Sequence, residues 1–93
     1  MEERGTCLTD KDGAFEVWVW NGVLHRDNGP ASYNKDIGAS SWYRNGRLHC
    51  TSGPALVDAG HPDRYFVDGI EYFNKLEWAV AVAAFKQEYP DEA

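Results

Sequence analysis

Residues 14–73 consist of short apolar runs separated by polar, glycine-containing stretches. The runs are rich in aromatic and β-branched residues, as in VWVW at 17–20, which is typical of half-buried β-strands. The pattern therefore predicts several short strands instead of helices over this region. The expected strands are about residues 14–20, 23–26, 30–34, 40–44, 47–50, 54–58, 64–67 and 70–73.

Three dipeptides lie between adjacent runs: Asn21-Gly22, Asn45-Gly46 and Asp68-Gly69. These residue types tolerate the positive φ that both central positions of a type I′ turn require. Each dipeptide therefore predicts a tight hairpin. Since hairpins join neighbouring strands, the expected sheet is antiparallel.

The chain also contains an internal repeat. The stretch WNGVLHRDNGPA, from Trp20, returns as RNGRLHCTSGPA from Arg44, an offset of 24 residues. A shortened third copy, YFVDGIEYF, begins at Tyr65 and lacks Gly-Pro-Ala. Self-similarity at a fixed interval is typical of repeat architectures, so each copy is expected to form the same structural unit.

The pattern of apolar and polar positions changes to a helical one after residue 74. Asn74 suits an N-cap, with Glu77 at the N3 position, and Pro90 follows the segment KLEWAVAVAAFKQEY, which has helix-forming composition. This pattern predicts a helix over residues 75–88.

That helix carries two apolar stripes at 100° per residue. The bulky stripe, expected to face the sheet, comprises Trp78, Val82, Phe85 and Tyr89. The opposite stripe is a candidate interface and comprises Leu76, Val80, Ala83 and Ala84, with Lys75 and Lys86 on one border and Glu77 and Glu88 on the other. The second stripe is either covered by the sheet and the N-terminal arm or presented to another chain, in which case a homodimer is the commonest outcome.

Together these patterns predict one domain of the α+β class, mainly β: an antiparallel β-meander of tandem hairpin repeats with one C-terminal α-helix. A chain of 93 residues is long enough for one modest core. The expected organisation is an N-terminal arm at 1–13, the meander at 14–73, the helix at 74–89 and a disordered tail at 90–93.

The repeat units VWNGVLHRDNGPASY and WYRNGRLHCTSGPAL resemble the Trp-Tyr-x-Asn-Gly-x-Leu-His-Arg-x-x-Gly-Pro-Ala repeats of many small bacteriophage and large-DNA-virus proteins, a MORN-like variant. The resemblance covers about residues 15–74 and implies a meander of hairpins, often closed by a helix, with no implied activity. This chain departs from the motif at Cys50, where Arg is usual, and at Glu71-Tyr72, where Leu-His is usual. A function that requires the His-Arg pair in every repeat is therefore not expected.

Composition and charge limit the classes of partner that the chain is expected to bind. The net charge is −6, and no Lys/Arg cluster is present, which disfavours direct nucleic-acid binding. No apolar run reaches the roughly 18 residues of a membrane span, and the N-terminus lacks a signal-peptide pattern, so a cytoplasmic protein is expected. Cys7 and Cys50 are expected to be reduced thiols.

The conspicuous histidines, His25 and His49, occupy equivalent repeat positions, where each imidazole is expected to hydrogen-bond the backbone of the following polar corner. The chain offers no two ligands at metal-site spacing and no nucleophile with an orienting base, so neither a metal, a cofactor nor an enzymatic activity is expected. Cys50 beside His49 does not make a catalytic pair, because neighbours on a strand point to opposite faces.

Repeated aromatics suggest a core spine beneath the helix, formed by Trp18, Trp42 and Tyr65. Tyr43 and Phe66 alternate with that set and are expected to face outward, available to a partner. Acidic residues in or beside the corners would complete a partner-binding surface, either as mimics of phosphates or as a solvated rim: Asp27, Asp36, Asp58, Asp63 and Glu71.

The resemblance to phage proteins implies an accessory product that binds a host protein or ribonucleoprotein. The expected function is inhibition of a host defence complex, in the manner of an anti-CRISPR protein, by occupying a nucleic-acid-binding or assembly surface. The alternative is a structural viral accessory protein that forms a homo-oligomer.

Overall fold

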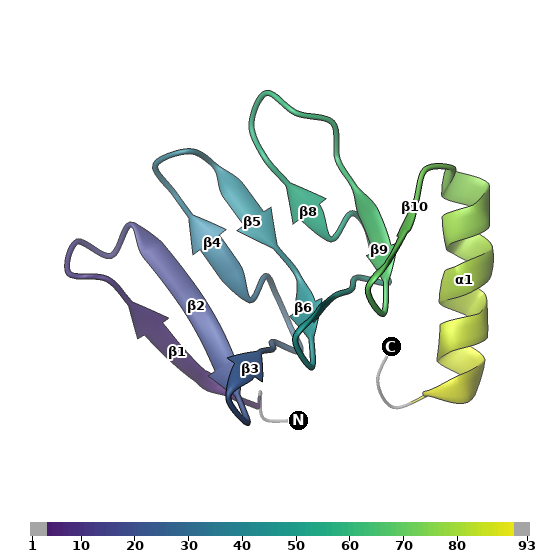
Figure 1. Ribbon diagram of the computed structural model, residues 1–93, viewed down its shortest axis with the longest axis horizontal. Coiled ribbons are helices and arrows are strands. Elements are labelled where there is room, and N and C mark those ends of the chain that lie inside the picture. Colours follow the sequence, from purple (N-terminus) through teal and green to yellow (C-terminus); the bar gives the residue numbers. More distant parts are fainter. Residues whose placement is uncertain (1–3, 91–93) are drawn as a thin grey trace.

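The computed structural model describes residues 4–90 and has the expected mainly β, α+β architecture, with short strands followed by one helix (Figure 1). The strands are β1 (Thr6–Thr9), β2 (Phe15–Trp20), β3 (Val23–Leu24), β4 (Ser32–Asn34), β5 (Ala39–Ser41), β6 (Tyr43–Arg44), β7 (Arg47–Leu48), β8 (Leu56–Val57), β9 (Tyr65–Val67) and β10 (Ile70–Tyr72). The helix α1 is Lys75–Glu88. Every pairing is antiparallel, as predicted.

The strands of the array are divided among three antiparallel sheets. Six of them make one sheet in the order β1-β2-β4-β5-β8, with β3 paired to β2, while β6-β7 and β9-β10 are separate hairpins. The break lies at Trp42, whose N–H donates to the Ala55 carbonyl (2.7 Å) and whose carbonyl accepts from His49 (2.9 Å). Because this residue bonds a different segment on each side, the predicted strand 40–44 divides into β5 and β6.

All three predicted hairpin turns are confirmed. Asn21, Asn45 and Asp68 have φ of 54°, 51° and 49°, and the following glycines have φ of 79°, 80° and 86°. Positive φ at both central residues is the conformation of a type I′ turn. The three turns lie along one edge of the molecule, which we call the turn edge, and the longer loops lie along the opposite edge (Figure 1).

Equivalent hydrogen bonds join successive repeats. Gly46 N–H donates to the Leu24 carbonyl, and Gly69 N–H donates to the Leu48 carbonyl, each at 2.8 Å. Thus the turn of each repeat is held by the Leu-His segment of the repeat before it. These contacts therefore recur at the same interval along the chain as the sequence motif.

The helix begins and ends where the sequence predicts. Asn74 caps it, since its side-chain oxygen accepts from the Leu76 N–H (2.7 Å) and the Glu77 N–H (3.3 Å). Val82 and Phe85 are buried against the last hairpin, with Trp78 beside them. The bulky stripe therefore faces the sheet, but α1 packs mainly on β9 and β10, at the end of the array (Figure 1).

That placement corrects the expected aromatic spine beneath the helix. Of its three members, Tyr65 contacts α1 through Trp78, with ring centroids 5.1 Å apart. Trp42 packs in a second core cluster, formed by Cys50, Ala55 and Phe66, and Trp18 lies under the guanidinium of Arg26 (4.2 Å). The repeats extend sideways away from the helix, so the helix covers the third copy and contacts only part of the second, including His49 and Cys50.

The segment expected as an N-terminal arm contains a strand, β1, which was not among the expected strands and which pairs with β2 over its full length. Phe66 does not face outward: its side chain is 6% exposed, because the twisted last hairpin is covered by the Cys50 cluster on one side and by α1 on the other. Tyr43 is half-buried. Of the tail predicted to be disordered, residues 91–93 lie outside the described part of the chain.

Candidate partner-binding site

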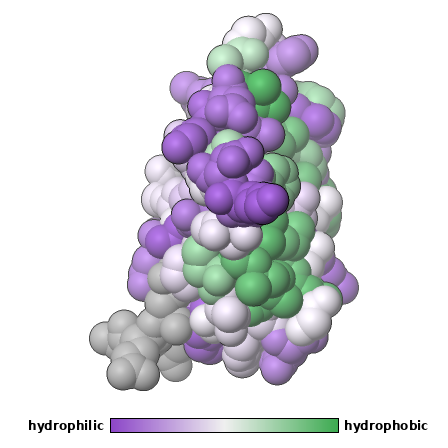
Figure 2. All heavy atoms as spheres, turned by 90° about the vertical axis from the view of Figure 1, so that its left-hand side faces the viewer, coloured by the Kyte–Doolittle hydropathy of each residue, from purple (hydrophilic) through white to green (hydrophobic). Residues whose placement is uncertain are grey.

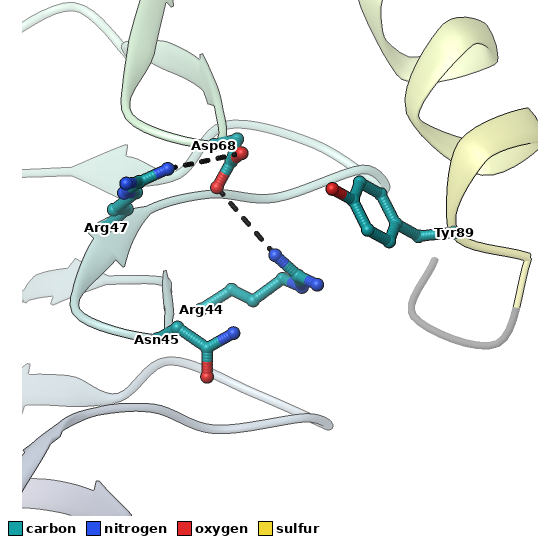
Figure 3. Close-up of a pocket in the computed structure, with 5 residues that line it drawn as sticks. All are labelled: Arg44, Asn45, Arg47, Asp68 and Tyr89. Atoms are coloured by element: carbon teal, nitrogen blue, oxygen red, sulfur yellow. Dashed lines mark hydrogen bonds and ion pairs between the residues drawn. The ribbon is translucent and has the colours of Figure 1, made fainter.

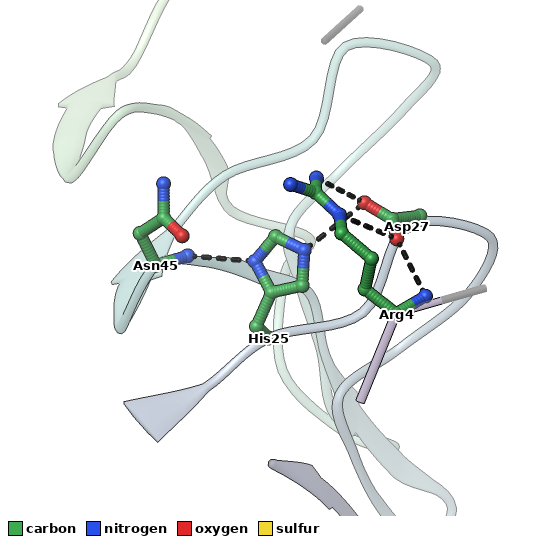
Figure 4. A network of polar contacts seen from close by, with 4 residues as sticks. All are labelled: Arg4, His25, Asp27 and Asn45. Atoms are coloured by element: carbon green, nitrogen blue, oxygen red, sulfur yellow. Dashed lines mark hydrogen bonds and ion pairs between the residues drawn. The ribbon is translucent and has the colours of Figure 1, made fainter. Parts of the chain in front are cut away.

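The histidines belong to the joints between repeats, and Figure 4 shows the joint at His25. His25 is 1% exposed, and its Nδ1 accepts from the backbone N–H of Asn45 at 3.0 Å. His49 repeats the contact with the N–H of Asp68 at 2.9 Å. The structural role is as predicted, but the partner differs: the imidazole bonds the turn of the next repeat and not the backbone of its own corner. Because the contact joins two copies of the repeat, the sequence of one copy does not indicate it.

The first joint is also tied to the N-terminal segment. His25 Nε2 contacts the Asp27 carboxylate at 3.0 Å, and the Arg4 guanidinium holds the same carboxylate at 2.7 and 3.2 Å (Figure 4). Hydrogen bonds from Arg4 hold the pKa of Asp27 well below its usual range. In its conformation here, Asp27 is an internal partner and is not available to another protein.

Glu71 is likewise paired with a side chain of the protein itself. Its carboxylate accepts two hydrogen bonds from the Arg64 guanidinium, at 2.6 and 2.8 Å. These bonds lower the pKa of Glu71 and raise the pKa of Arg64. Two of the five acids predicted to bind a partner therefore stabilise the protein itself.

The remaining three predicted acids, Asp36, Asp58 and Asp63, lie on the loops opposite the turns. We call this the loop edge and define it by residues 10–14, 35–38 and 58–64. Its loops adjoin, because Lys35 N–H donates to the Ala14 carbonyl (2.9 Å) and a Cβ on Gly38 would lie 3.7 Å from Ala59. The edge gathers carboxylates that are far apart in the sequence.

Sequence reasoning missed two acids of this edge, Asp10 and Asp12, because it did not identify β1 and therefore missed the β1–β2 loop. The five aspartates outnumber the basic residues of the edge, which are Lys11, Lys35 and the Glu71-bound Arg64. Asp58 has one close partner there, His61, at 3.4 Å. The edge therefore presents net negative charge.

Apolar side chains are exposed beside these acids. Leu8, Phe15 and Ile37 are 53%, 41% and 56% exposed, and each lies within a few residues of a loop-edge aspartate. In the strand register, Leu8 and Val17 share one face of the sheet, to which Phe15 also belongs. Figure 2, which views the molecule from the β1 end, shows an apolar band next to a polar one. Apolar surface with a polar rim is typical of protein interfaces.

The turn edge has a different character. A pocket of about 330 Å³ is lined by Arg44, Asn45, Arg47, Asp68 and Tyr89 (Figure 3). Asp68 lies 3.8 Å from the Arg44 guanidinium and 3.5 Å from that of Arg47, so its carboxylate lies between the two arginines. Arg44 also stacks over the Phe85 and Tyr89 rings, both at 5.0 Å.

The described residues form no cluster of metal-ligating side chains. Within residues 4–90, no three His, Cys, Asp or Glu side chains come together as metal ligands. Cys7 and Cys50 are not in a disulfide, and Cys50 is buried with its Sγ 3.5 Å from Ser52 Oγ. No helix in this part of the chain is long and apolar enough for a membrane crossing.

The fold and the two edges define a small hairpin-repeat protein with an acidic loop edge and a helix at one end. Comparison of the chain with known proteins found no matching family model, no matching curated protein and no matching solved structure.

Proposed function

We propose that this chain is a non-enzymatic protein-binding module that docks on a host protein or ribonucleoprotein through its loop edge. The observation that carries the proposal is the exposure of Leu8, Phe15 and Ile37 beside a row of aspartates. Buried apolar contacts would supply affinity, and the carboxylates would favour a partner with a basic groove.

Such a groove is what a nucleic-acid-binding protein presents. Each repeat adds two strands to the loop edge, so successive acidic loops are separated by about 10 Å, twice the interstrand spacing. A row of carboxylates at that spacing would compete with phosphates for arginines and lysines. The resemblance of the repeats to phage proteins supports a host defence complex as the target, with inhibition by occupation of its nucleic-acid path or assembly surface.

The test is affinity capture from bacterial extract on immobilised protein, with captured proteins identified by mass spectrometry and nucleic acid added as competitor. We expect a nucleic-acid-binding complex that the competitor displaces, and loss of capture with Asp36→Lys combined with Asp58→Lys. Capture that survives both the competitor and the double variant, or recovery of this chain alone, would overturn the proposal.

A matched pair of apolar variants locates the contact. Ile37 on the loop edge and Ile70 beside the turn edge are 56% and 60% exposed, so neither substitution should disturb folding. Ile37→Ser is expected to reduce capture severalfold, and Ile70→Ser should leave it unchanged. Equal effects of the two variants would place the binding surface elsewhere.

A further inference from the structure

The outer face of α1 is uncovered within the described part of the molecule. Leu76 and Val80 are 75% and 64% exposed, and Ala83 and Ala84 continue the stripe as exposed residues. Phe73, just before the helix, is 89% exposed. The sheet and the N-terminal strand do not cover this stripe, which was one of the two possibilities that the sequence left open. Because α1 is the last layer of the array, its outer face is accessible (Figure 1).

Charged residues border the stripe in a regular order. Lys75 and Lys86 lie along one border, and Glu77 and Glu88 lie along the other. Both pairs are 11 residues apart, which is about three helical turns. Within residues 4–90, none of these four side chains has an ion-pair partner. The borders therefore carry opposite charges at matching heights.

This arrangement is complementary to itself in one orientation. When two helices pack in parallel about a two-fold axis, the left border of each meets the right border of the other. Lys75 then lies beside Glu77 of the second copy, and Lys86 lies beside Glu88. Antiparallel packing brings each border against its own counterpart, which places lysine against lysine and glutamate against glutamate.

We infer that the outer face of α1 binds a second copy of this chain, with the two helices parallel. Leu76, Val80 and Ala83 form the apolar seam, and the four charged residues form the flanking ion pairs. A helix of 14 residues is about 21 Å long, so the seam is short. This surface is separate from the loop edge, so the inference and the proposed function can fail independently.

The first experiment measures mass against concentration by sedimentation equilibrium, with Cys7→Ser in every chain to prevent thiol cross-linking. We expect a monomer–dimer equilibrium that Val80→Lys abolishes. Ile70→Lys is the matched control, because it places the same charge on a similarly exposed apolar residue that lies outside both the helix and the loop edge. A strict monomer up to millimolar concentration, or equal effects of the two variants, would overturn the inference.

The second experiment tests the charge pairing. Lys75→Glu with Lys86→Glu leaves both borders negative and should weaken the dimer at least tenfold. Adding Glu77→Lys and Glu88→Lys exchanges the borders and should restore wild-type affinity in a parallel dimer. Failure of the fourfold variant to recover would contradict the ion pairs.

Orientation is then read from disulfide cross-linking. In a parallel dimer, Leu76→Cys forms a covalent dimer with itself on mild oxidation. In an antiparallel dimer centred on Val80, position 76 instead faces position 84, so Leu76→Cys would cross-link only to Ala84→Cys. That second result would overturn the parallel arrangement.

Discussion

At the scale of single residues, the conspicuous side chains hold the repeats together. His25 is buried because its imidazole completes the hydrogen bonding of a turn 20 residues further along the chain. Its Nδ1 accepts a backbone N–H, so its proton is on Nε2, which donates to Asp27. A buried group that satisfies two partners is costly to remove, since both partners lose their bonds.

Replacing His25 by Ala should lower the free energy of unfolding by about 3 kcal/mol, through the cavity and the unsatisfied Asn45 N–H. His61→Ala is the control, because the His61 side chain is 73% exposed and its loss should change stability by less than about 0.5 kcal/mol. Urea denaturation followed by tryptophan fluorescence measures both. Similar stability of the two variants would show that His25 is not a structural residue.

Asp27 makes stability depend on pH. Its pKa is lowered in the folded protein, so its contribution is complete above the unfolded pKa of about 3.9 and is lost as the pH falls towards the folded pKa. Asp27→Asn should therefore be less stable than the wild type at pH 7, with the difference shrinking by pH 3. Denaturant midpoints at both pH values test this, and Asp36→Asn serves as the exposed control. A constant difference would contradict the linkage.

At the scale of elements, local signals predicted well and long-range ones did not. The turns and α1 follow from neighbouring residues, namely Asn-Gly or Asp-Gly pairs and the cap at Asn74. Strand β1 was missed because TCLT carries little signal by itself and becomes a strand by pairing with β2. The burial of Phe66 and the partners of His25 depend on which repeat packs beside which, and alternation along one strand does not contain that information.

The turn glycines offer a matched comparison. Gly22 and Gly46 have φ of 79° and 80°, so alanine is strained at either position by about 1 kcal/mol. A Cβ on Gly46 would also lie 3.3 Å from the Val23 Cβ, whereas a Cβ on Gly22 meets nothing within 4 Å. Gly46→Ala should therefore cost more than Gly22→Ala, and Gly46→Val about 3 kcal/mol. Unchanged melting of Gly46→Val would contradict the turn at 45–46.

At the scale of the whole molecule, the protein is a flat array of 41 × 33 × 19 Å whose repeats contact mainly their neighbours. Its core is accordingly divided into two small clusters, one between the second and third copies and one beneath α1. In such arrays, stability is approximately the sum of repeat and interface contributions. The acidic loop edge is likewise a property of the assembled array, because its loops come from three separate segments.

An added repeat should therefore stabilise the chain. Inserting a second copy of residues 28–51 directly after Thr51 preserves every Leu-His to turn contact and adds one interface. The melting temperature and the urea m-value should both rise. A control insertion that omits Asn45 and Gly46 lacks the turn and should destabilise the protein. Equal behaviour of the two insertions would mean that the repeats are not joined through their turns.

The equivalent joints between copies also bear on how such a chain can change over generations. Duplication or loss of one 24-residue unit in the gene would lengthen or shorten the middle while leaving β1 and α1 untouched at the two ends. The acidic loop edge would then become longer or shorter in steps of about 10 Å. Binding reach could thus be adjusted by copy number alone, with no need to redesign either terminus.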